Sequence, residues 1–380
     1  MSEPAWAPLT GFRVAVTSAR RADELSALLR KRGATVTSAP AIEMVPLPDD
    51  EELRLHTESL IDAPPDIVIA TTGIGFRGWI AAADGWGLAG DLITALGKAR
   101  VVSRGPKATG ALRAAGLPEE WSPESESSRE VLHYLVDGGI SGRRIAVQLH
   151  GATAEWDPFP EFLDELRTAG ADVVPIRVYR WNPTPRHGDF DQLVAGIAEQ
   201  KFDAVSFTSA PAVAAVLMRA GEMGLSDAVL TALRSKVHAM CVGPVTARPL
   251  VRLGIPTSAP ERMRLGALAR HITDELPLLQ SRTMHVAGHR LEIRGTCVVV
   301  DGAVKEVAPA GMATLRALAQ RPGAVVSRTD LLRALPGSGT DTHAVETAVL
   351  RLRTALGDKN IVATVVKRGY RLPVDEQPTR

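Results

Sequence analysis

The amino-acid sequence predicts an α/β protein with two parallel-sheet domains and a smaller C-terminal domain of helices and a β-hairpin. Three observations lead to this prediction. Residues 12–277 alternate short β-branched runs with amphipathic helical patterns, which is typical of parallel sheets covered by helices. The same residues repeat once in a nearly constant register. Residues 310–372 change to helical patterns followed by a basic hairpin, and a chain of 380 residues has room for two or three domains.

The first half of the repeat begins with a predicted strand at residues 14–17. An amphipathic helix is expected at residues 23–32, and Gly33 stands where a helix commonly ends. Strands follow at residues 67–70 and 99–103, with another helix between them. This order gives one sheet with helices on both faces.

The second half repeats these features. Matching positions lie 137, 137 and 138 residues apart, namely Gly33 and Gly170, Asp66 and Asp203, and Gly105 and Gly243. Chance does not maintain such a register over a long stretch of sequence. The repeat therefore predicts two similar α/β domains with a cleft between them.

Small hydroxyl residues follow the predicted strands and precede predicted helices. The stretches are Thr71-Thr72-Gly73, Thr208-Ser209-Ala210 and Gly243-Pro244-Val245-Thr246. In open parallel sheets, ligands lie beyond the carboxyl ends of the strands, where helix N-termini favour anions. We expect an acidic ligand bound by Thr17, Thr72, Gly73, Thr208 and Gly243. The alternative is that these residues only cap helices.

The composition indicates a folded protein, with 45% hydrophobic and 23% charged residues. Cys241 and Cys297 form no Cys-x-x-Cys pair, so neither a disulfide framework nor a zinc site is indicated. His285 and His289 have no carboxylate companion nearby, so no metal is expected. The sequence contains no run approaching the roughly 18 apolar residues that span a bilayer, and no signal pattern. We expect a cytoplasmic protein without membrane contact.

The C-terminal region differs from the rest in charge. Residues 284–380 carry 14 Lys and Arg against 9 Asp and Glu, a net +5, whereas the remainder carries 30 against 34, a net −4. Helical patterns at residues 310–321, 327–333 and 343–357 precede the hairpin. This order is what lays one helix in a DNA major groove and braces it with a wing. The basic charge indicates that this region meets phosphate.

The third of these helices is predicted to have one buried side and one side facing DNA. Its core residues are Val345, Val349, Leu352 and Leu356, and His343, Thr347, Leu350, Arg351 and Thr354 turn away from them. We expect Thr347 and Arg351 to read bases and Arg353 to meet phosphate. The full set of predicted DNA contacts is Arg328, His343, Thr347, Arg351, Arg353, Thr354, Lys367 and Arg368. The alternative is a solvated basic face.

Residues 12–277 resemble uroporphyrinogen-III synthase, the enzyme that closes linear hydroxymethylbilane into the type III tetrapyrrole. The resemblance rests on residues 207–209, 242–247 and 170–180. It implies two α/β domains joined by a two-stranded connector, with no metal and no cofactor.

The resemblance also implies domain limits. Connectors are expected near residues 40–47 and 175–183. The first domain is then discontinuous, with residues 1–43 and 180–277 enclosing a second domain of residues 44–179.

The same resemblance implies catalytic positions. Tyr179 matches the tyrosine that assists loss of the substrate hydroxyl, Ser209 matches a hydroxyl of the cleft, and Thr246 matches the threonine beside the glycine turn. The sequence departs from the family pattern at Ser18, where an arginine often stands, at Ala108, where threonine is usual, and at Ala210-Pro211, where a second hydroxyl is lost.

The C-terminal region resembles the DNA-binding domain of response regulators, at residues 307–309, 321–332, 351–358 and 367–372. It implies a winged-helix domain at residues 289–374 after a linker at residues 278–288. We identify no receiver domain with a phospho-acceptor aspartate before it, so phosphorelay control is not expected. The fusion is similar to a type of actinobacterial regulator that includes the regulator of nitrate and nitrite assimilation.

Three hypotheses follow, in order of preference. The first is a transcription regulator whose synthase-like region senses a tetrapyrrole-like or other small anionic effector. The second is a bifunctional protein that converts hydroxymethylbilane and also binds DNA. In the third, the synthase-like region serves only dimerisation or a protein partner. In each case we expect double-stranded DNA with repeated half-sites as a partner, and at least a dimer on DNA.

Overall fold

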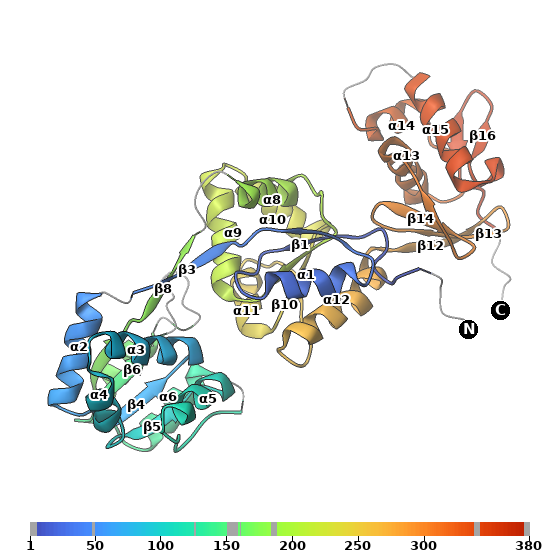
Figure 1. Ribbon diagram of the computed structural model, residues 1–380. Helices are drawn as coiled ribbons and strands as arrows, with labels where there is room; N and C mark the ends of the chain where they lie inside the picture. The colour runs from blue at the N-terminus through green and yellow to red at the C-terminus, as the bar shows by residue number, and fades with distance from the viewer. Residues whose placement is uncertain are drawn as a thin grey trace. The chain divides into compact units, whose positions relative to one another are not determined.

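The computed structural model describes residues 6–47, 50–124, 127–149, 159, 161–183, 188–337 and 343–375 (Figure 1). Contacts divide the chain into two units. Unit 1 comprises Met1–Pro40, Arg186–Ser209 and Val216–Arg380, and unit 2 comprises Ala41–Pro185 and Ala210–Ala215. Within the described ranges, none of the helices has the length and apolar content needed to cross a membrane.

Unit 2 is built on a parallel sheet with strand order β5-β4-β6-β7. Its strands are β4 (Ile67–Ala70), β5 (Arg100–Ser103), β6 (Arg144–Gln148) and β7 (Asp172–Ile176). The pleat of β4 sends alternate side chains to opposite faces, with Val68 and Ala70 in one hydrophobic cluster and Ile67 and Ile69 in the other. Both faces are therefore buried, which explains why β4 is wholly apolar.

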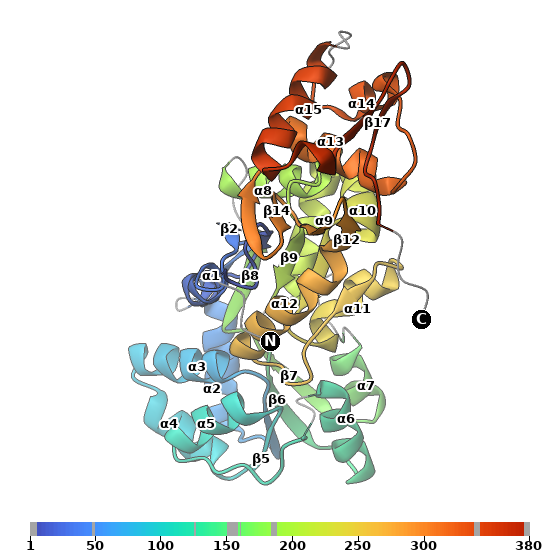
Figure 2. The same ribbon diagram turned by 90° about the vertical axis from the view of Figure 1, so that its right-hand side faces the viewer.

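Helices cover both faces of this sheet. They are α2 (Glu51–Asp62), α3 (Gly73–Gly85), α4 (Ala89–Leu96), α5 (Pro106–Ala114), α6 (Ser128–Asp137) and α7 (Phe162–Thr168). Figure 2 shows α6 and α7 on the opposite side of the sheet from α3, α4 and α5. The largest side chain of this core, Trp79, is fully buried, and its indole N–H donates to the Thr57 hydroxyl at 2.9 Å.

Unit 1 contains a second parallel sheet with strand order β11-β10-β9-β1-β2. The strands are β1 (Arg13–Val16), β2 (Thr35–Ser38), β9 (Ala204–Phe207), β10 (His238–Cys241) and β11 (Thr257–Ser258). The accompanying helices are α1 (Ala22–Arg30), α8 (Asp189–Ala198), α9 (Ala210–Glu222), α10 (Ser226–Ser235), α11 (Pro244–Arg252) and α12 (Leu265–Gln280).

The two sheets show the sequence repeat in three dimensions. The order β10-β9-β1-β2 in unit 1 corresponds to β5-β4-β6-β7 in unit 2. Strands from the first half of the sequence therefore pair with strands from the second half in each sheet. Where the chain passes between the units, β3 (Ile42–Pro46) and β8 (Tyr179–Pro183) pair antiparallel, which confirms the predicted two-stranded connector.

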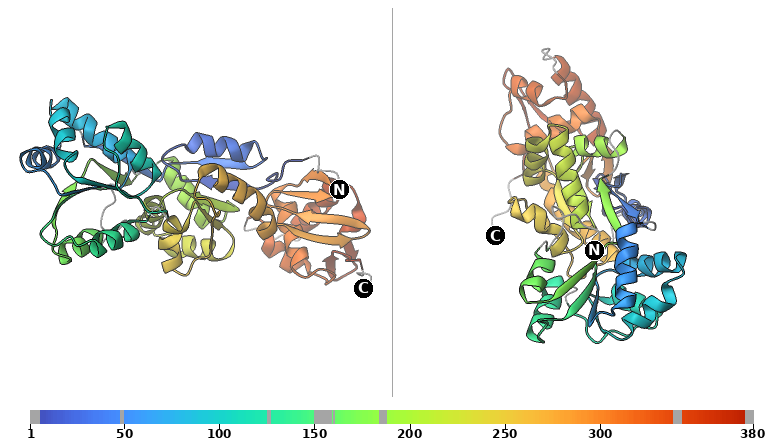
Figure 3. Two further views of the ribbon diagram at one scale, coloured as in Figure 1. Left: turned by 90° about the horizontal axis from the view of Figure 1, so that it is seen from below. Right: turned by 90° about the vertical axis from the view of Figure 1, so that its left-hand side faces the viewer.

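The C-terminal domain, which belongs to unit 1, begins with an antiparallel sheet and ends with a hairpin. Its elements are β12 (Arg282–Val286), β13 (His289–Ile293), β14 (Cys297–Val300), β15 (Ala303–Glu306), α13 (Pro309–Gln320), α14 (Arg328–Ala334), α15 (His343–Leu356), η1 (Lys359–Ile361), β16 (Ala363–Val365) and β17 (Gly369–Arg371). The helices pack on one face of the β12–β15 sheet (Figure 3). On that face, Leu291 and Val298 meet Leu315 and Leu352 in one core. This arrangement is the predicted winged helix.

The stretch expected to be a linker, residues 278–288, has regular structure. Helix α12 continues to Gln280 and β12 begins at Arg282, which leaves Ser281 between them. Met284 and Val286 are buried in the core of the C-terminal domain, and this burial fixes the segment as a strand rather than a loop. The first strand of the C-terminal domain thus precedes residue 289.

Candidate DNA-binding surface and candidate ligand site

Helix α15 of the C-terminal domain presents a mainly polar stripe to solvent. Val345, Val349, Leu352 and Leu356 are buried, as the helical spacing predicted. The opposite side, here called the α15 stripe, consists of the exposed residues His343, Thr347, Leu350, Arg351 and Thr354. Leu350 is 65% exposed, so an apolar side chain stands in the middle of this stripe.

Two predicted DNA contacts, Arg328 and His343, lie close to the Glu346 carboxylate. The Glu346 carboxylate lies 3.5 Å from Nε of Arg328 and 3.1 Å from Nδ1 of His343. The Arg328 guanidinium also lies 5.3 Å from the centroid of the Tyr370 ring. These contacts hold Arg328 at the start of α14, next to α15.

The α15 stripe includes the predicted base readers Thr347 and Arg351, with Thr354 further along the helix. The Thr354 hydroxyl donates to the Leu350 carbonyl at 3.1 Å, so part of its hydrogen-bonding capacity is used inside the helix. In the described part of the chain, the side chains of Thr347 and Arg351 make no hydrogen bond or ion pair. Both side chains are therefore available to an outside partner.

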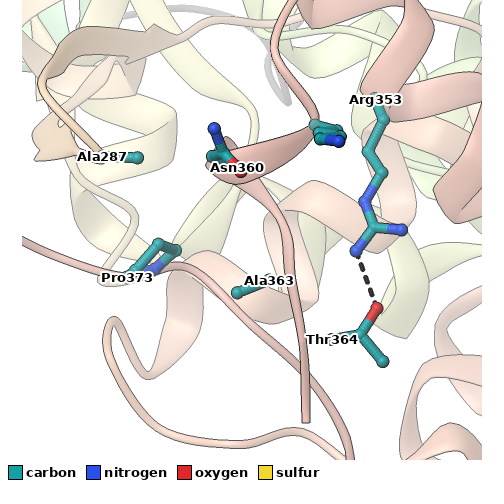
Figure 4. A pocket seen from close by; sticks show the side chains of 7 residues that line it. Ala287, Arg353, Asn360, Ala363, Thr364 and Pro373 are labelled. Atoms are coloured by element: carbon teal, nitrogen blue, oxygen red, sulfur yellow. Dashed lines mark hydrogen bonds between the residues drawn. The ribbon is translucent and has the colours of Figure 1, made fainter.

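Arg353 has a different environment from Arg351. Its Nε and Nη2 donate to the Val362 carbonyl at 2.8 and 2.5 Å, and Nη2 donates to the Thr364 hydroxyl at 2.8 Å (Figure 4). The guanidinium lies 5.9 Å from the centroid of the Tyr370 ring. Whereas the sequence led us to expect a phosphate contact, the structure shows Arg353 fastening α15 to the start of the β16–β17 hairpin.

The hairpin presents cations at its tip. Val366, Lys367 and Arg368 are exposed, and Lys367 adopts a left-handed conformation with φ of 60°. A Cβ at Gly369 would lie 2.0 Å from the Val326 carbonyl oxygen, so this position requires glycine. The tight turn aims Lys367 and Arg368 away from the core, as a wing that meets phosphate requires.

In unit 2, the candidate ligand site is built at the N-terminus of α3. The Thr72 hydroxyl caps this helix by accepting from the Gly75 N–H at 3.2 Å. It also shares a hydrogen bond of 3.1 Å with the hydroxyl of Tyr179, which is 5% exposed. Gly73, the first residue of α3, packs closely on α5, because a Cβ there would lie 2.0 Å from the Lys107 carbonyl oxygen.

Gln148, which is absent from the residues predicted from the sequence, organises this site. It is fully buried at the end of β6, its Oε1 accepts from the Thr72 N–H at 3.0 Å, and its Nε2 donates to the Thr72 hydroxyl at 3.3 Å. Its own carbonyl accepts from the Thr71 hydroxyl at 2.7 Å. The available signal was a polar residue directly after the apolar run Ile145-Ala146-Val147, at the ligand edge of a parallel sheet.

Unit 1 carries a corresponding set of hydroxyls at the ends of β1 and β9. The Thr17 hydroxyl donates to the Ser206 carbonyl at 2.8 Å, and the Thr208 hydroxyl donates to the Ser18 hydroxyl at 3.1 Å. Thr17 and Ser18 are fully buried, whereas Thr208 is half-buried. Ser18, which stands in place of the family arginine, is thus part of a local hydroxyl network.

The remaining predicted residues of unit 1 lie at two helix starts. Ser209 directly precedes α9 and is half-buried. Thr246 is buried in the first turn of α11, after Gly243, where a Cβ would lie 2.6 Å from the Met263 side chain. The structure therefore brings Tyr179 together with Thr72 in unit 2, whereas Ser209 and Thr246 belong to unit 1.

His289 has carboxylate companions that its local sequence does not show. Its Nδ1 lies 2.5 Å from Asp301 and its Nε2 lies 3.2 Å from Asp358, and these hydrogen bonds raise the pKa of His289. Among the described residues, no group of three His, Cys, Asp or Glu side chains is arranged to hold a metal ion. His289 instead connects β13 to the β14–β15 turn and to the end of α15.

Comparisons with known proteins match the two repeated α/β sheets and the C-terminal domain separately. The family model for uroporphyrinogen-III synthase HemD matches residues 23–270, and the model for the C-terminal domain of transcriptional regulatory proteins matches residues 302–372.

Individual relatives match the same parts. The uncharacterised protein YjjA of Bacillus subtilis is 31% identical over 261 residues, which are 68% of this chain and 94% of YjjA. A crystal structure of a mutant uroporphyrinogen III synthase from Thermus thermophilus is 30% identical, with a TM-score of 0.57, and the match covers 68% of this chain and 96% of that one. The transcriptional regulatory protein CutR of Streptomyces coelicolor is 35% identical over 111 residues, which are 29% of this chain and 49% of CutR.

The winged helix and its family match together make this protein a DNA-binding regulator. The larger match covers more than half of the chain and coincides with the two repeated α/β sheets. The chain belongs to the uroporphyrinogen-III synthase HemD family, in a form that also carries the C-terminal domain of transcriptional regulatory proteins.

Proposed function

We propose that this protein is a transcription regulator whose synthase-like region senses a small anionic, tetrapyrrole-like effector. Its C-terminal domain would bind repeated half-sites on double-stranded DNA as an oligomer. The observation that carries the proposal is the exposed pair Thr347 and Arg351 on α15, whose side chains make no hydrogen bond or ion pair with any described residue, in a chain whose larger part belongs to a tetrapyrrole-forming family.

Base reading is assigned to the α15 stripe. Arg351 has the fork of N–H donors that pairs with O6 and N7 of guanine, and Thr347 lies one turn before it. The wing cations Lys367 and Arg368 supply contacts to phosphate, which add affinity without sequence preference. A single winged helix covers a short stretch of DNA, which supports binding to repeated half-sites.

An anionic effector suits the groups at the strand ends. In unit 2 these groups are hydroxyls, a buried amide and the N-terminus of α3, held together through Thr72. Helix N-termini and hydroxyl donors favour carboxylates, which are the charged groups of hydroxymethylbilane and of the tetrapyrrole made from it.

Binding is favoured over turnover for this site. The synthase reaction depends on holding a reactive chain in one geometry, so small displacements abolish it more readily than they abolish binding. Tyr179 is buried, and its hydroxyl is engaged with Thr72. Ser18 and Ala108 depart from the family pattern at positions that grip the substrate. These features support a region that has kept a ligand site and lost the reaction.

A cyclisation assay tests this function. Hydroxymethylbilane is supplied to the full-length protein, the products are oxidised, and type III porphyrin is compared with the spontaneous type I isomer. We expect type I only, together with a thermal shift in the presence of uroporphyrin III. A ligand at 100 times its dissociation constant adds about 2.7 kcal/mol to the free energy of unfolding.

Each other outcome selects a different function. Type III product that is lost in Tyr179→Phe would establish an active synthase with a DNA-binding domain. If neither product selectivity nor a thermal shift were observed, the region would serve association alone. Separately, enrichment of duplexes from a random pool tests DNA binding, with Arg351→Ala as the variant expected to lose enrichment.

A further inference from the structure

Residues near the N-terminus of unit 1 contact the loop between β13 and β14 of the C-terminal domain. Arg294 lies in this loop, and its side chain is only 4% exposed. Its Nη1 donates to the carbonyls of Pro8 and Thr10, at 2.9 and 3.2 Å. We call Arg294 and its partners the Arg294 clasp.

The buried charge of Arg294 is well compensated. Its Nε donates to Glu292 at 2.7 Å, and the guanidinium lies 4.0 Å from the centroid of the Trp6 ring and 5.3 Å from that of Phe12. A buried cation costs stability unless it is paired and hydrogen-bonded, and here both conditions are met. Arg294 can therefore remain buried as a cation at the contact between these two segments.

Two glycines allow the backbone near the N-terminus of unit 1 to approach the β13–β14 loop closely. Gly11 has φ of 87°, and a Cβ there would lie 2.4 Å from Sγ of Cys297. A Cβ at Gly295 would lie 2.4 Å from the Gly11 carbonyl oxygen and 2.5 Å from Oδ2 of Asp203. The Gly11 carbonyl accepts from the Thr296 N–H at 2.7 Å. Larger residues at either glycine would force the two surfaces apart.

The clasp reaches the sheet of unit 1 through Asp203. This carboxylate accepts from the Arg13 N–H at 2.7 Å, and the Asp203 N–H donates to the Arg13 carbonyl at 2.8 Å, which ties the starts of β1 and β9 together. From α13, Arg316 donates to the Gly295 carbonyl beside this pair. Burial raises the pKa of Asp203 and lowers that of Arg316.

The internal repeat contains a second copy of the Arg13–Asp203 pair, and this copy is not part of the Arg294 clasp. In unit 2, Asp66 accepts from the Arg144 N–H at 2.8 Å and donates its own N–H to the Arg144 carbonyl at 2.8 Å. The Asp66 side chain is 39% exposed, whereas that of Asp203 is 7% exposed. The repeated pair ties two strands in both sheets, and the Asp203 copy lies against Gly295 of the C-terminal domain.

Strands β1 and β9 connect the clasp with the predicted ligand residues. They begin at Arg13 and Ala204, next to Asp203, and they lead to Thr17 and Thr208. Four residues of strand span only about 13 Å. Both strands are buried in the unit 1 sheet and pair with each other, so a displacement at one end is transmitted to the other.

We propose that the Arg294 clasp makes the unit 1 sheet and the DNA-binding domain one cooperative unit, through which occupation of the site at Thr17 and Thr208 changes DNA affinity. The DNA half of this inference rests on the proposed function. Coupling between two binding sites is reciprocal, so DNA would in turn change the affinity of the site at Thr17 and Thr208 for its ligand. In one cooperative unit, DNA would also suppress the opening of β1 and β9.

Hydrogen exchange of the full-length protein tests the coupling. The probe is a duplex enriched by the protein from a random pool, present at 100 times its dissociation constant. In the wild type, DNA is expected to slow exchange of the core amides of β1 and β9 by up to about 100-fold, because these strands open only with the DNA-binding domain. In Arg294→Ala the slowing should be confined to β12–β17.

Arg290→Ala is the matched control. Arg290 lies on β13, its side chain is 54% exposed, and it stands 3.9 Å from the same Glu292, so its loss should leave the slowing intact. Arg294→Lys keeps the charge, but a single ammonium nitrogen cannot stand both where Nε donates to Glu292 and where Nη1 donates to the two carbonyls, so it should resemble the alanine variant. Slowing confined to β12–β17 in the wild type would overturn the proposal.

Urea unfolding of the same proteins, followed by exchange at β1 and α13, separates this inference from the proposed function. Shared midpoints in the wild type and separate midpoints in Arg294→Ala are expected whether or not any duplex is enriched. Separate midpoints in the wild type would refute the cooperative unit. Failure to enrich any duplex would refute DNA binding alone.

Discussion

Replacing Arg353 by alanine separates two roles for a cation on the DNA-binding helix. The sequence predicted a phosphate contact, whereas in the structure its guanidinium donates to the Val362 carbonyl and the Thr364 hydroxyl. If Arg353 contacts phosphate, its replacement reduces DNA affinity and the salt dependence of that affinity. If Arg353 serves the hairpin, its replacement reduces the stability of the domain, because α15 is no longer hydrogen-bonded to the hairpin.

The expected loss of stability follows from these bonds. Hydrogen bonds to a charged group stabilise by about 1.5–3 kcal/mol each. Two of the three bonds share the Val362 acceptor, and the Arg353 side chain is only half-buried. We therefore count a single contribution, about 1.5–3 kcal/mol. If unit 1 unfolds as one cooperative unit of roughly 150–250 residues, the loss of this contribution lowers its Tm by roughly 3–12 °C.

The assay combines thermal unfolding with DNA binding at several salt concentrations. Arg353→Ala should lower Tm and leave the slope of log affinity against log salt unchanged, because each phosphate contact contributes about 0.9 to that slope. Arg351→Ala, two residues away on α15, should instead keep its stability and lose affinity for DNA. Its stability should change by less than about 0.5 kcal/mol, and it should lose about 1–3 kcal/mol on an enriched site and much less on random DNA.

An unchanged Tm together with a reduced salt slope in Arg353→Ala would refute the structural role of Arg353. Arg353 would then contact phosphate, and its bonds to the hairpin would not persist in solution. If Arg351→Ala weakens enriched and random DNA equally, Arg351 contacts the backbone and reads no base.

Three further predictions concern single side chains. Leu350→Ala should weaken binding to an enriched duplex severalfold, but not after thymine is replaced by uracil at the contacted step, because an exposed leucine on a base-reading helix would pack on a thymine methyl group; equal losses on both duplexes would contradict this. His289 has a raised pKa, so its pairing with Asp301 and Asp358 stabilises the fold below pH 6.5 and this stabilisation is lost as pH rises through the raised pKa. The decrease in urea midpoint caused by His289→Gln should therefore be larger at pH 6 than at pH 9. Gln148→Leu leaves the N-cap of α3 without its buried amide partner and should cost about 1–3 kcal/mol in urea unfolding; a neutral result would show that this network is not formed.

The sequence predicted those features that depend on local periodicity. The buried side of α15 followed from helical spacing alone, and the paired sheets followed from the constant offset between matching glycines and aspartates. The partner of Arg353 was not predictable in this way, because Val362 offers a backbone carbonyl and every residue carries one.

Contacts between distant residues were beyond the reach of sequence patterns. Gln148 meets Thr72 across 76 residues, and Arg294 meets Pro8 across 286. In both cases the chain is brought together by the exchange of strands between the repeated halves or by the docking of the C-terminal domain. The linker prediction was wrong for a related reason, because β12 is a strand only through its burial in the domain that follows it.

The repeated Arg–Asp pairs test whether the C-terminal domain remains docked in solution. A hydrogen bond from the Arg144 N–H lowers the pKa of Asp66, whereas burial raises that of Asp203. A lowered pKa gives stability that is present at higher pH and lost as pH falls through the folded value. A raised pKa gives stability that is present at low pH and lost as pH rises through the folded value.

The stability lost on replacing each aspartate by asparagine should therefore change with pH in opposite directions. Between pH 3.5 and 6, the loss in Asp66→Asn should grow with pH, and the loss in Asp203→Asn should shrink. Urea midpoints of the two variants and the wild type across this range measure both slopes. Asparagine keeps an oxygen that can accept the N–H of the paired arginine, so the comparison isolates the charge. If both losses grow with pH, Asp203 is as well solvated as Asp66, and the Arg294 clasp that buries it is open in solution.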